Sequence, residues 1–577
     1  MKALRFVLAA PLQKPQFFEK IEAAVELDQV CAGGPRLWTN HGVPIIDLGD
    51  AGQIVGLVFS KTSTTPLRCL PPDAPLKGGP ASLAAWLMRA CWGGYVALLS
   101  DRATGRIAAI VDPSGLCPVY RSKTLTHIIL ASHPDLVRTV TSAPLVVSWQ
   151  GLRSCLLRPE LRQISTCLVG ITELPPGELV RIDERSLGGE RIWRPDDFMP
   201  GRITMSFDEA AEELRNIAIP VIGAWAKMLG PVAVAASGGV DSSFICAALK
   251  AGDESFTCAT VSTDDASGDE RAFVNMLGNH LGVQTKSAVY DPATVDPQRG
   301  VSAGLARPTR KAFMAALDTA LFQAGRSVGA SVIFDGNGGD NLFCFLHSSA
   351  PVVDRIRCEG LGRGSFLTFL DMCRVTGCDM PTMARAMMRR LSRREFPRWP
   401  ADISLLAGLP EVHEEIEPLT PWFQTDVGRH GGKRDHLALI MRAQHHVHGL
   451  TTCGLPRFSP IMSQPLIEFC LGIPTWIWPE GGINRALARS AFAAELPHEI
   501  LTRTSKSGPD SFIRRSFDQH RLTIRNLLMD GLLAQHGVID RSAVHDALNT
   551  DVISGGDIVY RLLDLAEAES WARSWQN

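Results

Sequence analysis

The fold is decided by P-V-A-V-A-A-S-G-G-V-D-S-S-F-I-C-A-A-L-K, residues Pro231 to Lys250. The apolar run Val232–Ala236 predicts a buried strand of a parallel sheet. A tight glycine turn follows, and the apolar residues from Phe244 to Leu249 predict a helix behind it. Strand, glycine turn and helix N-terminus together can hold phosphate oxygens, because the first-turn N–H groups have no intrahelical partner and the helix dipole favours an anion.

The turn lacks the G-x-x-x-x-G-K-[ST] pattern of a Walker A loop. Asp241 stands where that loop has lysine, so a cation must lie between its carboxylate and the phosphates, and Mg²⁺ is the obvious one. S-G-G-x-D-S is similar to the pyrophosphate loop of the ATP-pyrophosphatase superfamily, which cleaves ATP to AMP and pyrophosphate. The resemblance makes Ser237, Gly238, Gly239, Asp241 and Ser242 the nucleotide contacts. A plain structural turn is the alternative.

Composition is that of a cytoplasmic globular protein. The 577 residues allow about two to four domains. The 58 Lys and Arg almost balance the 60 Asp and Glu, which gives no reason to expect nucleic acid or an anionic membrane as partner. The 14 cysteines form no C-x-x-C pair and are interpreted as reduced core thiols. The first residues, M-K-A-L-R-F-V-L-A-A-P, favour a β-strand over a signal peptide, and no stretch approaches a transmembrane span.

Residues 1–200 are predicted to form one β-rich domain. The apolar runs Ile54–Phe59, Tyr95–Leu99 and Ile107–Val111 predict strands, and helices are expected at Ser82–Cys91 and after Trp149. Four segments, which begin at Trp92, Ile110, Ala131 and Gly170, resemble the glutaminase domain of asparagine synthetases: W-G-G-Y-V-A-L-L-S-D, I-V-D-P-S-G-L-C-P-V-Y, A-S-H-P-D-L and G-I-T-E-L-P-P-G. The resemblance implies a glutaminase-like, N-terminal-nucleophile sandwich.

The chemistry of that domain depends on a cysteine at position 2. This chain has Lys2, and its first cysteine is Cys31. A lysine side chain cannot serve as the thiolate nucleophile. We therefore expect a degenerate amidotransferase-like domain that keeps its shape without hydrolysing glutamine, so ammonia from glutamine is not the amine donor.

Residues 201–577 are predicted to form the second domain, after a linker between Arg191 and Phe207. Strands and helices alternate along it, which predicts a doubly wound parallel sheet with a helical C-terminal part from about residue 360. Ligands bind beyond the carboxyl ends of such strands, so the loops after Ala236, Val261 and Phe334 are expected to carry the chemistry, with Val261 as a nucleotide contact. The elements predicted beside Val232–Ala236 are Phe256–Val261, Asp269–Leu281, Thr285–Val289, Arg310–Ala324 and Ser331–Asp335.

The loop after Phe334 is F-D-G-N-G-G-D-N-L-F, and it supplies a second acid, Asp340. Asp241 and Asp340 from separate loops can hold Mg²⁺ against triphosphate oxygens while leaving it several waters. Gly336 and Gly338 let the loop approach the nucleotide. The alternative is that Asp340 caps the following helix.

The likeness to asparagine synthetases continues in S-P-I-M-S-Q-P-L-I-E from Ser459 and in Asn484 to Gly508. The resemblance implies that Lys506 approaches the α-phosphate and the tetrahedral intermediate, with Arg489 as a phosphate or structural partner. A fixed cation suits both negative species. A solvated surface lysine is the alternative for Lys506.

Asn337 stands inside the second loop, where asparagine synthetases have Glu and β-lactam synthetases have Tyr. The form G-N-G-G-D looks like lasso-peptide macrocyclases, which also carry an inactive glutaminase-like domain. The resemblance implies an ATP-dependent cyclase that adenylates an Asp or Glu side chain of a precursor peptide, whose N-terminal amine then closes an isopeptide ring. A leader peptidase and a leader-recognition protein are the further partners implied.

Three readings stay open beside this one. The chain can be a β-lactam synthetase-like or an ammonia-using asparagine synthetase-like enzyme on a small carboxylate, or an inactive scaffold.

The histidines His445, His446 and His448 have poor spacing for zinc. They are expected in a surface or packing role, with a peptide-site or amine-assisting role as the alternative.

Overall fold

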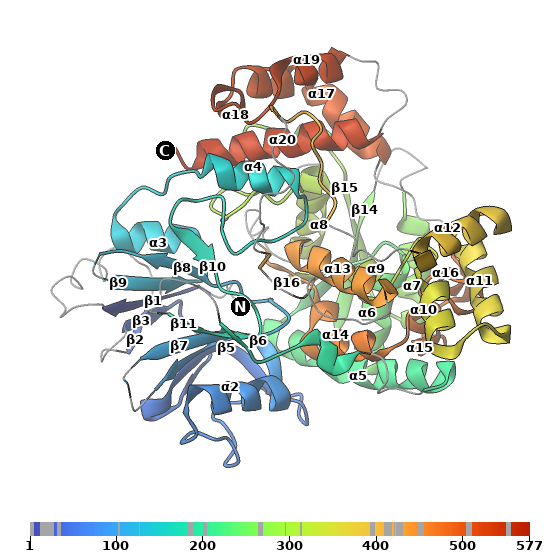
Figure 1. Cartoon of the computed structure of the whole chain (residues 1–577), viewed down its shortest axis with the longest axis horizontal. Helices are drawn as coiled ribbons and strands as arrows, with labels where there is room; N and C mark the ends of the chain where they lie inside the picture. The colour runs from blue at the N-terminus through green and yellow to red at the C-terminus, as the bar shows by residue number, and fades with distance from the viewer. Residues whose placement is uncertain are drawn as a thin grey trace.

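The computed structural model of the chain describes two halves, a β-sandwich followed by an α/β part (Figure 1). The described residues are 5–11, 28–31, 36–101, 104, 106–125, 127–182, 189–199, 205–262, 269–294, 296–311, 314–392, 399–408, 418–419, 422, 431–446, 455–503, 510–549 and 556–576.

The first half contains two six-stranded antiparallel sheets. One has the order β10 (Ile171–Glu173), β8 (Tyr120–Lys123), β9 (His127–Ala131), β1 (Phe6–Pro11), β3 (Arg36–Thr39) and β2 (Asp28–Cys31). The other has the order β12 (Glu190–Arg191), β11 (Glu178–Arg181), β7 (Ile107–Val111), β6 (Cys91–Ser100), β5 (Gly52–Ser60) and β4 (Ile45–Asp47). The three strands predicted here lie in β5, β6 and β7.

Alternating side chains of the strands build the layers of the sandwich. Phe6 and Leu8 of β1 face the other sheet in a shared core, whereas Val7 points to the outer side. That outer side is covered by α3 (Pro134–Thr141) and α4 (Trp149–Leu157), and α2 (Gly79–Ala90) covers the opposite sheet (Figure 1). β1 confirms the prediction of an N-terminal strand.

The second half opens with α5 (Phe207–Leu229). Ser206 and Glu209 form a reciprocal capping box at its start, which fixes where the helix begins. Before it, η2 spans Pro195–Phe198, and the predicted boundary at residue 200 falls on residues outside the described ones.

A five-stranded parallel sheet forms the centre of this half, as predicted. Its order is β15 (Thr285–Val289), β14 (Phe256–Ser262), β13 (Val232–Ala235), β16 (Val332–Phe334) and β17 (Arg457–Phe458). One face, with Val232 and Val234, packs against α5, α6 (Val240–Ala251) and α7 (Arg271–Leu281). The other face, with Ala233 and Ile333, packs against α8 (Ala315–Ser327), so helices cover both faces.

One predicted helix begins later than expected. The pattern predicts Arg310–Ala324, but α8 begins at Ala315. Arg310 adopts a left-handed φ of 60°, which an α-helix does not allow, and its Nε donates to Asp564 at 2.7 Å.

The rest of the chain is mostly helical, as predicted, and α17 to α20 pack back on α4 (Figure 1). The remaining elements are η1 (Gly49–Ala51), η3 (Pro292–Thr294), α9 (Gly339–Leu342), α10 (Ala350–Glu359), α11 (Arg363–Thr376), α12 (Met380–Ser392), α13 (Gly431–His446), η6 (Pro460–Met462), α14 (Gln464–Gly472), η7 (Glu480–Gly482), α15 (Ala486–Ala491), α16 (His498–Leu501), α17 (Asp510–Met529), α18 (Leu532–Gln535), α19 (Arg541–Asn549) and α20 (Gly556–Ser574).

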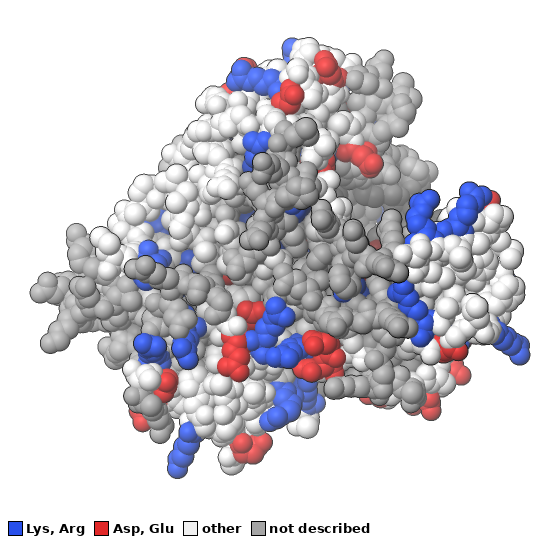
Figure 2. Space-filling view, viewed as in Figure 1, with Lys and Arg blue, Asp and Glu red and all other residues white. Residues whose placement is uncertain are grey.

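The described cysteines form no disulfide, and the described charged side chains form no large patch of one sign on the face shown in Figure 2. Cysteines that the structure describes carry free thiols, and the Sγ atoms of Cys246 and Cys258 lie 3.8 Å apart. Where Figure 2 shows described residues, basic and acidic side chains are interspersed. Within the described ranges, no helix has both the length and the apolar character that crossing a bilayer requires.

Candidate active site

The two predicted acidic residues meet at the carboxyl edge of the parallel sheet. Asp241 lies in the first turn of α6, and Asp340 lies in α9, the short helix after β16. Nη1 of Arg485 donates to Oδ2 of Asp241 at 2.8 Å and to Oδ1 of Asp340. One guanidinium nitrogen therefore touches both carboxylates, which places the two loops side by side.

Asp340 does not act as the cap of its helix. The N-cap position of α9 is Gly338, which has no side chain, and the Asp340 carboxylate turns to Arg485 instead. The Asp340 side chain is 55% exposed, whereas those of Asp241 and Arg485 are 14% and 12% exposed. A cation and its ligands can therefore reach Asp340 from solvent, whereas Asp241 lies deeper in the protein.

The glycines of the second loop allow its close approach to the first. A Cβ at Gly339 would lie 2.2 Å from Cγ of Asp241, and one at Gly336 would lie 2.9 Å from the backbone N of Ser242. Gly338 has a φ of 88°, which a side chain would strain. Gly336 and Gly338 are predicted to contact a nucleotide; in the structure Gly336 lies against the first loop, whereas Gly338 lies against Met462 and Ala443.

Hydrogen bonds within the first loop fix its shape. Ser237 N donates to Ser242 Oγ at 3.2 Å, and Gly239 N donates to Ser237 Oγ at 3.3 Å. Gly238 has a φ of 63°, and a Cβ there would meet Cβ of Phe273 at 2.4 Å. Turn hydroxyls and glycines thus hold the backbone in the bent form that a phosphate-binding loop requires.

Arg503 is a support of this loop that the sequence did not single out. Its Nη1 donates to Ser237 O at 2.9 Å, its Nη2 pairs with Glu270 at 2.9 Å, and its guanidinium lies 3.9 Å from the centre of the Phe273 ring.

Val261, the remaining predicted nucleotide contact, is half-buried near the end of β14. It lies two residues beyond Ala259, which pairs with Ala235 of β13. It therefore lies at the same edge of the sheet.

Arg489 serves the backbone around the site. All five of its N–H donors have oxygen partners: the carbonyls of Asn484, Ile500, Leu501 and Arg503, and the Asn484 side chain. Burial, together with the positive charge of a neighbouring arginine, lowers the pKa of Arg489 to about 10. These contacts favour the structural alternative. Lys506, three residues beyond this segment, lies outside the described residues.

Asn337 is bound into a buried polar cluster beneath the second loop. Its Nδ2 donates to Oδ2 of Asp335 at 2.9 Å, and the same carboxylate accepts from Nε of Arg457 at 2.8 Å and from Ser459. Arg457 also pairs with Asp318. An amide fits here because it donates to Asp335, which a carboxylate at position 337 could not do.

Asp241 and Asp340 are the residues that would hold Mg²⁺. In the part of the chain that the structure describes, no three His, Cys, Asp or Glu side chains gather as a metal site. A pair of carboxylates that leaves the remaining coordination positions to phosphates and water fits Mg²⁺.

Of the three clustered histidines, His445 is buried. Burial is the larger cause, and the charges of His446 and nearby arginines add to it, in holding the pKa of His445 well below its usual range. His448 lies outside the described residues.

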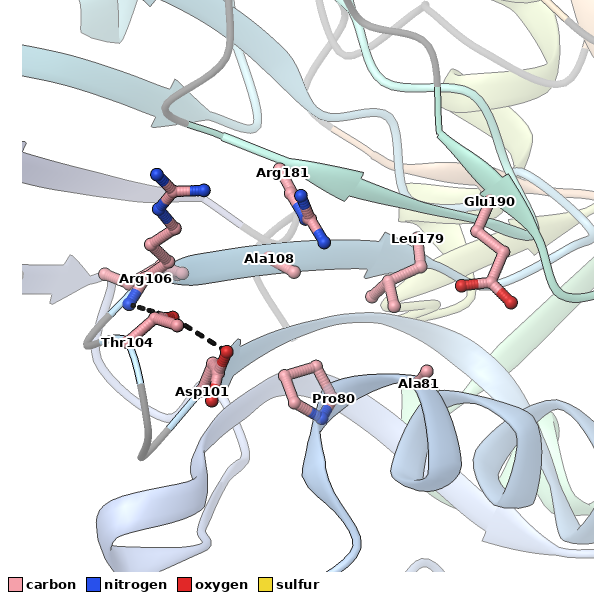
Figure 3. A pocket seen from close by; sticks show the side chains of 10 residues that line it. Pro80, Ala81, Asp101, Thr104, Arg106, Ala108, Leu179, Arg181 and Glu190 are labelled. Carbon is pink, nitrogen blue, oxygen red and sulfur yellow. Dashed lines mark hydrogen bonds between the residues drawn. The ribbon is translucent and has the colours of Figure 1, made fainter.

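A hollow of about 350 Å³ lies elsewhere, on the sandwich (Figure 3). It opens between the start of α2 and strands β7, β11 and β12, and Arg106, Arg181, Asp101 and Glu190 line it. Thr104 Oγ1 donates to Asp101 Oδ2 at 2.7 Å on its rim. Its mixed charges do not select an anion, and its walls come from elements other than those of the two-aspartate site.

Comparison with known proteins identifies the family of the chain. The family profile described as asparagine synthase matches residues 227–417 and 450–573, which is more than half of the chain. No curated protein matches the chain. Among solved structures, glutamine phosphoribosylpyrophosphate amidotransferase from B. subtilis, complexed with ADP and GMP, is similar at 9% identity over 70% of this chain and 98% of that chain, with a TM-score of 0.21. The chain belongs to the asparagine synthase family, and with it to the ATP-dependent ligases.

Proposed function

We propose that the chain is an AMP-forming ligase that adenylates an Asp or Glu side chain of a precursor peptide and joins it to the peptide's own N-terminal amine. The observation that carries this proposal is that Asp241 and Asp340 both contact the guanidinium of Arg485, beside the bent Ser237–Ser242 loop. The product is an isopeptide macrolactam of the lasso type.

The first step needs a place for the leaving pyrophosphate. The substrate carboxylate attacks the α-phosphorus of ATP, and the bond from that phosphorus to the pyrophosphate breaks. Backbone N–H groups at the start of α6 would hold the leaving group, because the N-cap Gly239 supplies no side chain to cap them. Mg²⁺ held by Asp241 and Asp340 would shield the phosphate charge. Lys506, through the family resemblance, is the cation for the α-phosphate.

The second step favours a peptide amine over ammonia. Lys2 replaces the nucleophile that would release ammonia from glutamine, and Asn337 brings no carboxylate base. An α-amine, with a pKa of about 7.7–8.0, is partly neutral near pH 7.5. Holding both reacting groups of one chain together supplies much of the rate as proximity.

A small carboxylate is the second candidate substrate, as in β-lactam synthetase-like or ammonia-using enzymes, and a partner-binding scaffold is the third reading. A leader peptidase and a leader-recognition protein in the cytoplasm are the partners proposed with the cyclase. The carboxylate pair favours activity over a scaffold, because the Asp340 side chain is 55% exposed and can reach a ligand.

ATP–pyrophosphate exchange separates these candidates. A leaderless peptide with one internal acidic residue is expected to support exchange, and the same peptide with that residue changed to its amide is the control. An N-acetylated peptide should support exchange without ring formation. Exchange with aspartate or another small acid alone would point to the second candidate, and no exchange with any acid would contradict the ligase.

A further inference from the structure

His446 and Glu160 form a pair that joins the two halves of the molecule. His446 is the last residue of α13, and its Nε2 lies 2.9 Å from Oε1 of Glu160. Glu160 belongs to the sandwich, in the turn after α4, where its φ is 64°. The imidazole comes from the ligase half and the carboxylate from the degenerate half.

The pair lies about one helical turn from the loop that carries Asp340. Asn341, next to Asp340, donates from Nδ2 to Leu439 O of α13 at 2.8 Å. Further along α13, the Cβ of Ala443 would lie 3.2 Å from a Cβ at Gly338. His446 follows three residues later, about 4.5 Å along the axis at 1.5 Å per residue.

The end of α13 is held in place from three sides. Nζ of Lys311 donates to the backbone O of His446. Nε2 of Gln444 donates to Ser114 O of the sandwich at 3.1 Å, and Nη1 of Arg162 donates to Gln444 O at 3.2 Å. His446 therefore has a fixed backbone position relative to both halves.

The surroundings keep Glu160 ionised and its partner accessible. Burial raises the pKa of Glu160, but the hydrogen bond and charge of His446, with Arg310 and Arg442, outweigh it and hold that pKa below its ordinary value. Nε of Arg442 lies 3.7 Å from Oε2 of Glu160. The side chains of His446 and Glu160 are 29% and 32% exposed, so a substrate can reach the ring.

A carboxylate on one ring nitrogen prepares the other as a base. With Nε2–H donating to Glu160, the Nδ1 lone pair is the position that accepts a proton, and the carboxylate stabilises the imidazolium that results. The other groups around the pair are His445, at 5.4 Å between ring centres, and Arg442 and Arg310, whose charges act on Glu160, while Lys311 donates to the backbone O of His446. Burial keeps the His445 ring neutral by lowering its pKa.

We propose that His446 is the proton acceptor for the attacking amine and that Glu160, supplied by the degenerate sandwich, orients it. This inference rests on the proposed function. The amine nitrogen forms a bond to the acyl carbon, the bond from that carbon to the phosphate oxygen breaks, and AMP leaves with the electron pair. The ammonium proton of the adduct passes to Nδ1 of His446. The sandwich thus completes the ligase site, which gives it a role although it lacks the glutaminase nucleophile.

Comparison of two nucleophiles tests the pair. Hydroxylamine traps an acyl-adenylate as a hydroxamate without needing a base, whereas ring closure needs one. His446→Gln is expected to keep hydroxamate formation within about threefold of wild type and to lose ring closure by about 10²–10⁴-fold. His280→Gln is the matched control: it makes the same change at an exposed position of α7 and should leave both rates unchanged.

Glu160→Gln tests the orienting role by separating turnover from binding. Loss of the carboxylate leaves the His446 ring without its partner at 2.9 Å, so kcat for ring closure should fall while the KM for the peptide and the hydroxamate rate stay near wild type. An unchanged kcat for ring closure in this variant, or an equal fall in hydroxamate formation, would contradict the role of Glu160. Ring closure at the wild-type rate in His446→Gln, or equal loss of hydroxamate and ring, would overturn the role of His446. Absence of hydroxamate with the wild-type enzyme would instead overturn the proposed function.

Discussion

Arg485 ties together the two acidic side chains on which nucleotide binding depends. It adopts a left-handed φ of 54°, and its guanidinium stacks 5.1 Å from the ring centre of Phe345. That position lets one cation contact Asp241 and Asp340, which would otherwise repel each other. Because Mg²⁺ prefers the same oxygens, Arg485 and the metal compete for this place.

Asp340→Asn is expected to abolish AMP formation with little change in stability, because Asp340 is exposed and serves no packing role. Outer partners of a metal are worth about 10–100-fold, so loss of a ligand should lower the exchange rate more than about 100-fold. Asp518→Asn, on the exposed face of α17, is the control. Exchange near the wild-type rate in Asp340→Asn would remove the metal role.

Asp112 predicts a pH dependence of stability. Burial raises the pKa of its carboxyl to about 7, against hydrogen bonds from Ser114, Tyr95 and Leu116. Between pH 3.8 and about 7 the unfolded chain is ionised while the folded chain stays protonated, so stability should fall as pH rises through this window, by up to about 4 kcal/mol. The thermal midpoint of Asp112→Asn should vary less with pH than that of wild type; an equal dependence would contradict the assignment.

Single residues could be predicted where the pattern is local. Asp241 and Asp340 each follow an apolar strand, and the carboxyl ends of parallel strands meet, so the sequence was enough to pair them. Arg485, Arg503 and Glu160 could not be found this way. Their contacts with Asp241, Ser237 and His446 span 244, 266 and 286 residues, and an isolated charged residue looks the same on any surface.

The loop before α6 and the loop before α9 pack closely against each other at the site. α6 and α9 approach so closely that Gly336 and Gly339 touch the backbone and side chain of the first loop. The predicted contact of Gly336 and Gly338 with a nucleotide stays a prediction, and the contact of Gly336 and Gly339 with the first loop could not be known from sequence. β17, two residues long, was missed because a strand that short has no period to detect.

Gly339→Ala should separate the two loops. A methyl group would lie 2.2 Å from Cγ of Asp241, so the carboxylates must move apart, and the apparent KM for Mg²⁺-ATP should rise at least about tenfold. Gly362→Ala is the matched control, because its Cβ meets open space in an extended backbone. Unchanged kinetics in Gly339→Ala would show that loop spacing is unimportant.

The two halves of the molecule are joined by buried charge. Glu173 of the sandwich pairs with Arg162 and with Arg307, which precedes α8. All three side chains are at most 8% exposed. The sandwich is thereby fixed against the α/β half, which carries His446, the partner of Glu160.

Glu173→Gln should destabilise the whole chain. It leaves two buried arginines without their carboxylate, which costs about 3–5 kcal/mol. Glu359→Gln breaks an exposed pair with Arg355 and should cost less than about 1 kcal/mol. Denaturant unfolding of the two variants measures the difference, and similar midpoints would contradict a structural role for the buried triad.

The most direct test is a structure of the chain with Mg²⁺ and α,β-methylene-ATP, which cannot be cleaved to AMP. We expect the metal between the carboxylates of Asp241 and Asp340, the triphosphate over Ser237–Ser242, and Arg485 turned from the acids to the phosphates. A nucleotide bound elsewhere, or Arg485 still bridging the two acids with nucleotide present, would contradict the account.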